Sequence, residues 1–188
     1  MSSMRPNLAI HFTDRNIQFR HLSSRDSWIE IGSLEYGDDW NSVRADFVRQ
    51  RAVRLSMGYV AAILILRSDL IQLSVFSPPD EHGNGLEEAV NSHLAERYGE
   101  NAEGLLCDWY SRPDYVTVAS VNAEEPHRIE NILSAFGFHV LAFAGMPDES
   151  GKFADPMIFG LTDSGRRHGL AGGTVKQLLS LPTPDAQR

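Results

Sequence analysis

Apolar and polar side chains alternate along the first twenty residues, which is typical of short strands with one buried face. Leu8, Ile10 and Phe12 lie at every second position, and the same period returns at Ile17 and Phe19. The four residues that precede Ile17, TDRN, have turn-forming composition. We therefore expect the two runs to pair as strands of a tight hairpin.

A third strand and a helix are expected next. Ile29 and Ile31 fall on one face of a strand that ends near Gly32, so the chain begins with a three-stranded antiparallel meander. The polar segment 38–41 has the composition of a helix N-cap, and the apolar positions after it have helical spacing. An amphipathic helix is expected over residues 41–54.

The continuous apolar run at 60–66 indicates a strand covered on both faces, as in the centre of a parallel or mixed sheet. The elements predicted after it are bounded mainly by Gly, Pro, Ser and Asp residues. We expect strands at 70–76, 105–110, 115–121 and 138–143, and helices at 86–98 and 124–136.

The predicted elements divide the chain into two parts. Residues 1–145 are expected to form one domain, with a strand-helix module inserted or appended around 70–121. From Gly145 onward Gly, Pro, Asp and Ser dominate, so residues 146–188 are expected to form a loosely ordered C-terminal tail with one short helix around 174–181.

Composition narrows the class of protein. The 188 residues are 42% hydrophobic and carry a formal net charge of -8, which suits a soluble globular domain that repels nucleic acid. A single Cys and the absence of an early apolar stretch favour the cytoplasm. The longest apolar run is far shorter than the ~20 residues of a membrane helix, so we expect no direct membrane insertion and membrane contact only through a partner.

The segment IHFTDRNIQ, Ile10–Gln18, aligns without a gap on the signature I-D-x-G-[ST]-x-x-x-K of actin-like pilus-assembly proteins. Later segments, among them AAILILRSDLIQLSVFSPP and FGFHVLAF, follow in the same order and spacing. Over about residues 7–145 the chain resembles the cytoplasmic PilM-like and GspL-like proteins of type IV pilus assembly and type II secretion. The resemblance implies an α/β (mixed α+β) fold, an RNase H-like, actin-like half-domain whose three-stranded meander continues into a mixed sheet with flanking helices.

The chemical positions of that signature are replaced. The Asp of the phosphate loop corresponds to His11, the Gly to Thr13, and the Lys to Gln18. A neutral imidazole does not replace a carboxylate as a magnesium ligand, and a β-branched residue blocks close approach of the backbone to phosphate. We therefore expect a non-catalytic protein without a cofactor. The sequence also stops where the second half of an actin-like domain would begin, which leaves open that it is part of a longer protein.

Two other functions stay open. In the first, the degenerate loop, which also contains Asp14, still binds a nucleotide or another small anion for regulation. It does so through Thr13, the turn amides and Arg15 in place of the missing Lys. In the second, the chain is an unrelated small enzyme with a site assembled from distant residues. The seven His show no metal-ligand spacing and Cys107 reads as a small buried residue, so no metal site is expected.

The expected helix at 41–54 carries Arg44, Arg51 and Arg54, which either face solvent or bind an acidic partner. Trp28 is out of phase with Ile29, so it either packs under a helix or anchors an interface. The resemblance implies a protein partner, namely the cytoplasmic tail of a membrane protein or a motor ATPase. The main hypothesis is a scaffold or adaptor at the inner face of the membrane; homodimerisation through sheet edges is left open.

Overall fold

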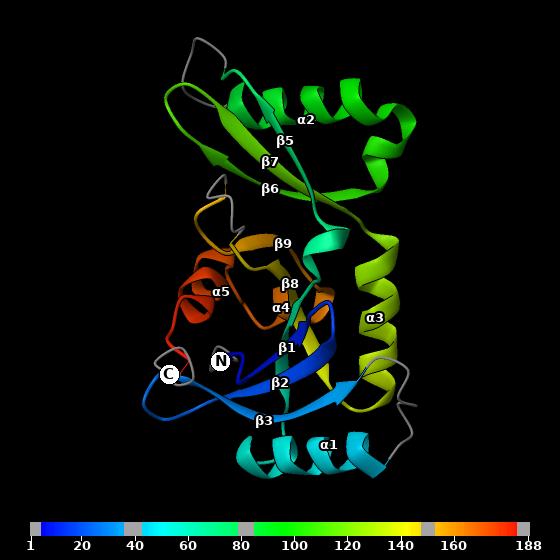
Figure 1. Ribbon diagram of the computed structural model, residues 1–188, viewed down its shortest axis with the longest axis vertical. Coiled ribbons are helices and arrows are strands. Elements are labelled where there is room, and N and C mark those ends of the chain that lie inside the picture. The colour runs from blue at the N-terminus through cyan, green and yellow to red at the C-terminus, as the bar shows by residue number, and fades with distance from the viewer. Residues whose placement is uncertain (1–4, 36–42, 79–84, 148–152, 184–188) are drawn as a thin grey trace.

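A computed structural model of the chain describes residues 5–35, 43–78, 85–147 and 153–183 (Figure 1). The predicted N-cap at 38–41 lies outside these ranges. The strands are β1 (Leu8–Phe12), β2 (Asn16–Leu22), β3 (Trp28–Glu35), β4 (Ala61–Ile65), β5 (Gln72–Phe76), β6 (Leu105–Ser111), β7 (Val116–Asn122), β8 (His139–Gly145) and β9 (Met157–Leu161). The α-helices are α1 (Val43–Leu55), α2 (Gly85–Tyr98), α3 (Glu124–Ala135), α4 (Asp163–Arg167) and α5 (Gly172–Leu179).

The main sheet has six strands in the order β3-β2-β1-β4-β8-β9. β1, β2 and β3 form the predicted antiparallel meander, with Ile10 opposite Phe19. β1 then pairs with β4 in parallel, β4 pairs with β8 in parallel, and β9 closes the far edge antiparallel to β8. All five residues of β4 are buried, as the continuous apolar run predicts for a central strand. The mixed sheet with flanking helices is confirmed.

The third strand differs from its prediction. β3 runs on to Glu35 instead of ending near Gly32, and a register shift lies opposite Phe19 and Arg20. A Cβ atom on Gly32 would lie 2.6 Å from Cγ2 of Val48 in α1. Gly32 therefore does not end the strand. Its missing side chain lets α1 pack directly on β3.

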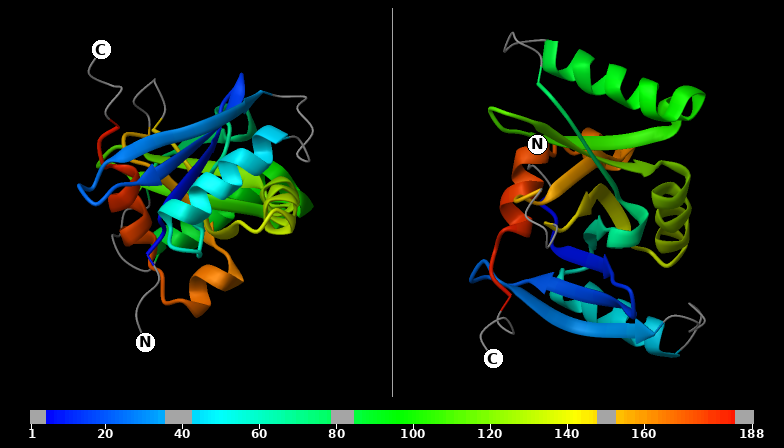
Figure 2. Two further views of the ribbon diagram at one scale, coloured as in Figure 1. Left: turned by 90° about the horizontal axis from the view of Figure 1, so that it is seen from below. Right: turned by 45° about the horizontal axis from the view of Figure 1, so that its top comes forward.

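The two faces of the main sheet are covered by different parts of the chain (Figures 1 and 2). Ala45, Val48 and Ala52 of α1 share one buried cluster with Ile129 and Leu133 of α3. The opposite face is covered by α5, through the buried residues Val175, Leu178 and Leu179, which share a second cluster with Ile63 and Ile65 of β4. Helices on both faces explain why the central strand is apolar throughout.

For the described residues 153–183 the prediction of a loosely ordered tail is wrong, whereas the short helix expected around 174–181 is present as α5. Residues 157–179 supply β9, α4 and α5, and Phe153 and Phe159 are buried. The buried Thr162 caps α4, because its Oγ1 accepts from the amide of Gly165 at 3.1 Å and donates to the carbonyl of Val140 at 2.7 Å. The apolar residues here lie in short groups, such as 157–159 and 178–179, between segments rich in Gly, Pro and charged residues. They are nevertheless needed, because the second face of the sheet has to be covered.

β5, β6 and β7 form a second sheet, in the order β5-β7-β6, with α2 on one face. Val90 and Leu94 of α2 are buried against this sheet, as the helical spacing at 86–98 predicts. The sheet is tied to the main body by Asp108 of β6. Its Oδ2 accepts from the amide of Ile158 at 2.8 Å and pairs with Nζ of Lys176 at 2.9 Å.

Candidate functional site

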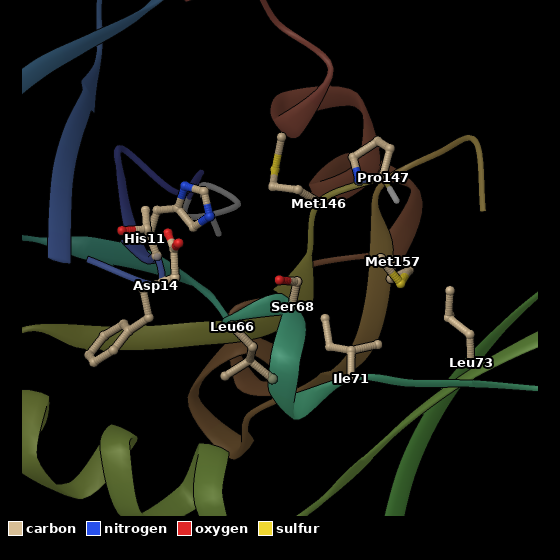
Figure 3. A pocket seen from close by; sticks show the side chains of 11 residues that line it. His11, Asp14, Leu66, Ser68, Ile71, Leu73, Met146, Pro147 and Met157 are labelled. Atoms are coloured by element: carbon tan, nitrogen blue, oxygen red, sulfur yellow. The ribbon is translucent and has the colours of Figure 1, made fainter. Parts of the chain in front are cut away.

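A pocket of about 470 Å³ lies where β1, β4 and β8 end, at the junction with the second sheet. The carboxyl ends of parallel strands are the common ligand-binding edge of open α/β sheets, so a degenerate phosphate loop is expected here. Figure 3 shows the side chains around it. The lining residues are His11, Phe12, Thr13, Asp14, Leu66, Ser68, Ile71, Leu73, Met146, Pro147 and Met157.

His11 contributes a neutral ring to this pocket. Burial, and then the nearby charge of Arg20, lowers the pKa of His11 from 6.5 to about 4. Its Nδ1 atom is buried and has no hydrogen-bond partner among the described residues. Because the ring is uncharged near neutral pH, it provides no positive charge for an anion and no carboxylate for a magnesium ion.

The turn between β1 and β2 is closed by Thr13. Its Oγ1 accepts from the backbone amides of Arg15, at 3.2 Å, and Asn16, at 3.0 Å. The same hydroxyl donates to the carbonyl of Asn16 at 2.9 Å. The two amides that could have turned toward a phosphate are therefore engaged within the turn itself.

The other loop residues supply little positive charge. Asp14 is the one charged residue of the pocket lining that the structure describes, and its carboxylate is exposed. Arg15 is exposed and does not line the pocket. Gln18 lies opposite His11 in the β1–β2 register, and its Oε1 accepts from Nη2 of Arg20 at 2.7 Å. An anion in this pocket would meet a carboxylate and no lining guanidinium.

Most of the remaining lining is apolar and was not predicted from the sequence. Leu66 and Ser68 follow β4, so they lie at the carboxyl end of a central parallel strand, where a site is expected. Ile71 and Leu73 reach the pocket only because the chain crosses there into the second sheet (Figure 3). The two methionines of the lining depend on the pairing of β8 with β9. No local pattern in the sequence predicts that β8 and β9 pair.

Of the predicted partner-contact residues, Arg51, Arg54 and Trp28 do not line the pocket. Arg51 and Arg54 are exposed on α1, whereas the side chain of Arg44 lies outside the described part of the chain. Trp28 is 3% exposed, and its Nε1 donates to the carbonyl of Leu178 in α5 at 2.8 Å. Trp28 thus packs under a helix, and its prediction as a partner contact is wrong because the tail covers it.

Other reactive groups among the described residues form no second centre. Within the described ranges no three His, Cys, Asp or Glu side chains gather as metal ligands. Burial, followed by the neighbouring carboxylate of Asp108, raises the pKa of the Cys107 thiol, which disfavours the nucleophilic thiolate. None of the helices in the described ranges is long and apolar enough to cross a membrane.

Comparison with known proteins gives matches at the level of structure. No protein-family model matches the sequence, and no curated protein resembles it closely enough to count as a match. The structure is similar to the cytoplasmic domain of EpsL, an inner membrane component of the type II secretion system of Vibrio cholerae. The TM-score is 0.51 at 14% identity, over 72% of this chain and 55% of that one.

A second similar structure is a chain of a PilM–PilN type IV pilus biogenesis complex, with a TM-score of 0.50 at 14% identity. The match covers 75% of this chain and 47% of that one. The chain thus spans about half the length of the two structures. Identity this low shows a shared fold and no more. The fold is the one that the resemblance implied, the actin-like fold of PilM-like and GspL-like proteins.

Proposed function

We propose that the chain is a non-catalytic scaffold or adaptor in a bacterial assembly of the pilus or secretion type. The observation that carries the proposal is the chemistry of the strand-end pocket. Where an actin-like protein would be expected to hold a nucleotide, this chain places the neutral ring of His11, the carboxylate of Asp14 and several apolar side chains.

The described lining offers one carboxylate for a magnesium ion but little to hold the phosphates of a nucleotide. Magnesium is usually bound by one or two carboxylates together with the phosphates, and the phosphates are bound by cationic side chains or free backbone amides. Asp14 is the single carboxylate in the described lining, and the amides of Arg15 and Asn16 bond to Thr13. These contacts favour the scaffold over the alternative, a regulatory domain that binds a nucleotide or anion.

The two similar structures suggest the kind of assembly. EpsL is described as an inner membrane component of type II secretion, and PilM as part of a complex with PilN. For this chain we therefore infer a place in the cytoplasm at the inner face of the membrane. The partner would be a protein, either the cytoplasmic tail of a membrane protein or a motor ATPase.

The proposal is tested by purifying the tagged chain from its own host after mild crosslinking. We expect inner membrane proteins of a pilus or secretion system to copurify, and their recovery to be unchanged when Asp14 is replaced by Ala. Asp14→Ala is a suitable control because Asp14 is exposed and forms no ion pair within the described residues. Recovery of unrelated soluble proteins alone, with no component of such a system, would contradict the proposal.

A further inference from the structure

Exposed apolar side chains lie along α1 and near its C-terminal end. Within the described residues the large hydrophobic side chains that are exposed are Ile29, Phe47, Leu55, Met57 and Val75. Phe47 and Leu55, 55% and 48% exposed, lie eight residues apart on α1, with Arg51 between them. Positions four residues apart share one helix face, so these three side chains form a continuous stripe.

Ile29 and Met57 extend this stripe. β3 and α1 run in opposite directions (Figure 1), and Nη1 of Arg51 donates to the carbonyl of Ile31 at 3.3 Å. Leu55 lies one helix turn beyond Arg51, and Ile29 lies two strand residues before Ile31, so both fall toward the same end. We call this area the α1 surface; it consists of Ile29, Phe47, Arg51, Arg54, Leu55 and Met57.

The α1 surface is also basic, in a chain with a net charge of -8. Arg51 and Arg54 have no carboxylate within 4.0 Å among the described residues, whereas the neighbouring Arg49 pairs with Asp46 at 3.9 Å. Within the described ranges, Arg51 and Arg54 donate only to backbone carbonyls, those of Ile31 and Gln50. Guanidinium groups without a carboxylate partner beside exposed apolar side chains complement a segment that carries carboxylates beside its own apolar face.

The surroundings of the surface decide how such a segment docks. β3 is an edge strand, but its free edge is partly occupied. The amide of Trp28 donates to the carbonyl of Pro182 at 3.0 Å, and Arg51 donates to the carbonyl of Ile31. Addition of a partner strand is thus obstructed. A second copy of the chain would bring Arg51 and Arg54 against the same residues, which repels.

We infer that the α1 surface docks an acidic amphipathic helix of a partner protein. Apolar side chains of that helix cover Phe47 and Leu55, and its carboxylates meet Arg51 and Arg54. This inference rests on the proposed function, since it names the surface and chemistry through which the scaffold holds a protein.

The test uses two fluorescent helical peptides of about 18 residues with the same leucine stripe. One carries Glu and the other Lys beside the stripe, and fluorescence anisotropy measures their binding to the full chain. We expect the Glu peptide to bind, and salt to weaken it. R51E/R54E should cost at least about tenfold in affinity for the Glu peptide and should gain binding of the Lys peptide. F47S and L55S should each lower the affinity for the Glu peptide about tenfold.

The controls are R25E, an exposed Arg elsewhere, and V75S, whose side chain is 48% exposed like that of Leu55. Both should leave Glu-peptide binding unchanged. Equal binding of the two peptides, or no effect of R51E/R54E, would overturn the inference. Two further results would also overturn the inference. One is that the chain sediments with phosphatidylcholine–phosphatidylglycerol vesicles and R51E/R54E abolishes this binding; the other is that it forms a dimer in ultracentrifugation and R51E/R54E abolishes the dimer. If the peptide measurements contradict the inference but inner membrane components still copurify with the R51E/R54E variant, the proposed function stands and the docking surface is wrong.

Discussion

Replacing Trp28 by Ala is expected to lower the free energy of unfolding by about 3 to 5 kcal/mol. Trp28 is 3% exposed and lies in the cluster that joins β3 and β4 to α5. Its Nε1 bonds to the carbonyl of Leu178, which lies 150 positions later in the sequence. Removing the indole therefore leaves a cavity and an unpaired carbonyl at the point where the last helix is attached to the first strands.

Urea denaturation followed by circular dichroism measures this effect. Trp28→Phe provides the graded control, because the ring still fills most of the space but no longer donates to Leu178; its expected cost is about 1 to 3 kcal/mol. A loss below about 1 kcal/mol for Trp28→Ala would mean that α5 does not cover this face of the sheet, and would contradict the fold of residues 157–179.

Replacing Gly165 by Ala is expected to cost more than about 3 kcal/mol of stability. A Cβ atom there would lie 2.1 Å from the carbonyl oxygen of Leu141 and 3.0 Å from its carbonyl carbon. These are backbone atoms of β8, which is buried in the sheet, so no side-chain rotation relieves the clash. α4 would have to move away from β8 and would strain the cap that Thr162 provides.

Gly173→Ala is the matched control for Gly165→Ala. Gly173 also lies in a helix, but the residue is exposed and a Cβ atom added to it would have no described atom within 4 Å. Ala is the better helix former, so this variant should be as stable as the wild type or more stable by about 0.5 to 1 kcal/mol. Chemical denaturation that shows equal losses for the two variants would rule out the close packing of α4 on β8.

The local patterns of the first 145 residues predicted most elements of the fold. A period of two at Leu8, Ile10 and Phe12 defines a half-buried strand, and the continuous run at 60–66 defines a central one. Local phase alone places Trp28 on the opposite face of its strand from Ile29. Its partner, Leu178, could not be found that way, because the contact depends on a helix far along the chain.

The tail shows why the rest escaped prediction. Phe153 and Phe159 are not part of any predicted element, because no clear period surrounds them, yet both are buried. The short helix expected around 174–181 is present as α5. Of the site, the loop signature identified His11, Thr13 and Asp14 as neighbours, and they do line one pocket. The two methionines of the pocket lining are brought there by strand pairing, which the sequence did not reveal. The hydroxyl of Thr13 accepts hydrogen bonds from the turn amides that the anion-binding alternative requires to be free.

A thermal melt of the full chain with millimolar ATP and magnesium tests the central claim, that this actin-like pocket holds no nucleotide. A ligand at a hundredfold excess over its Kd adds about 2.7 kcal/mol of stability, which would raise the Tm of a domain this size by about 5 °C or more. We predict a shift below about 1 °C, equal to that given by sodium chloride of the same ionic strength. A rise of several degrees that Arg15→Ala abolishes would contradict the claim and restore the nucleotide-binding alternative.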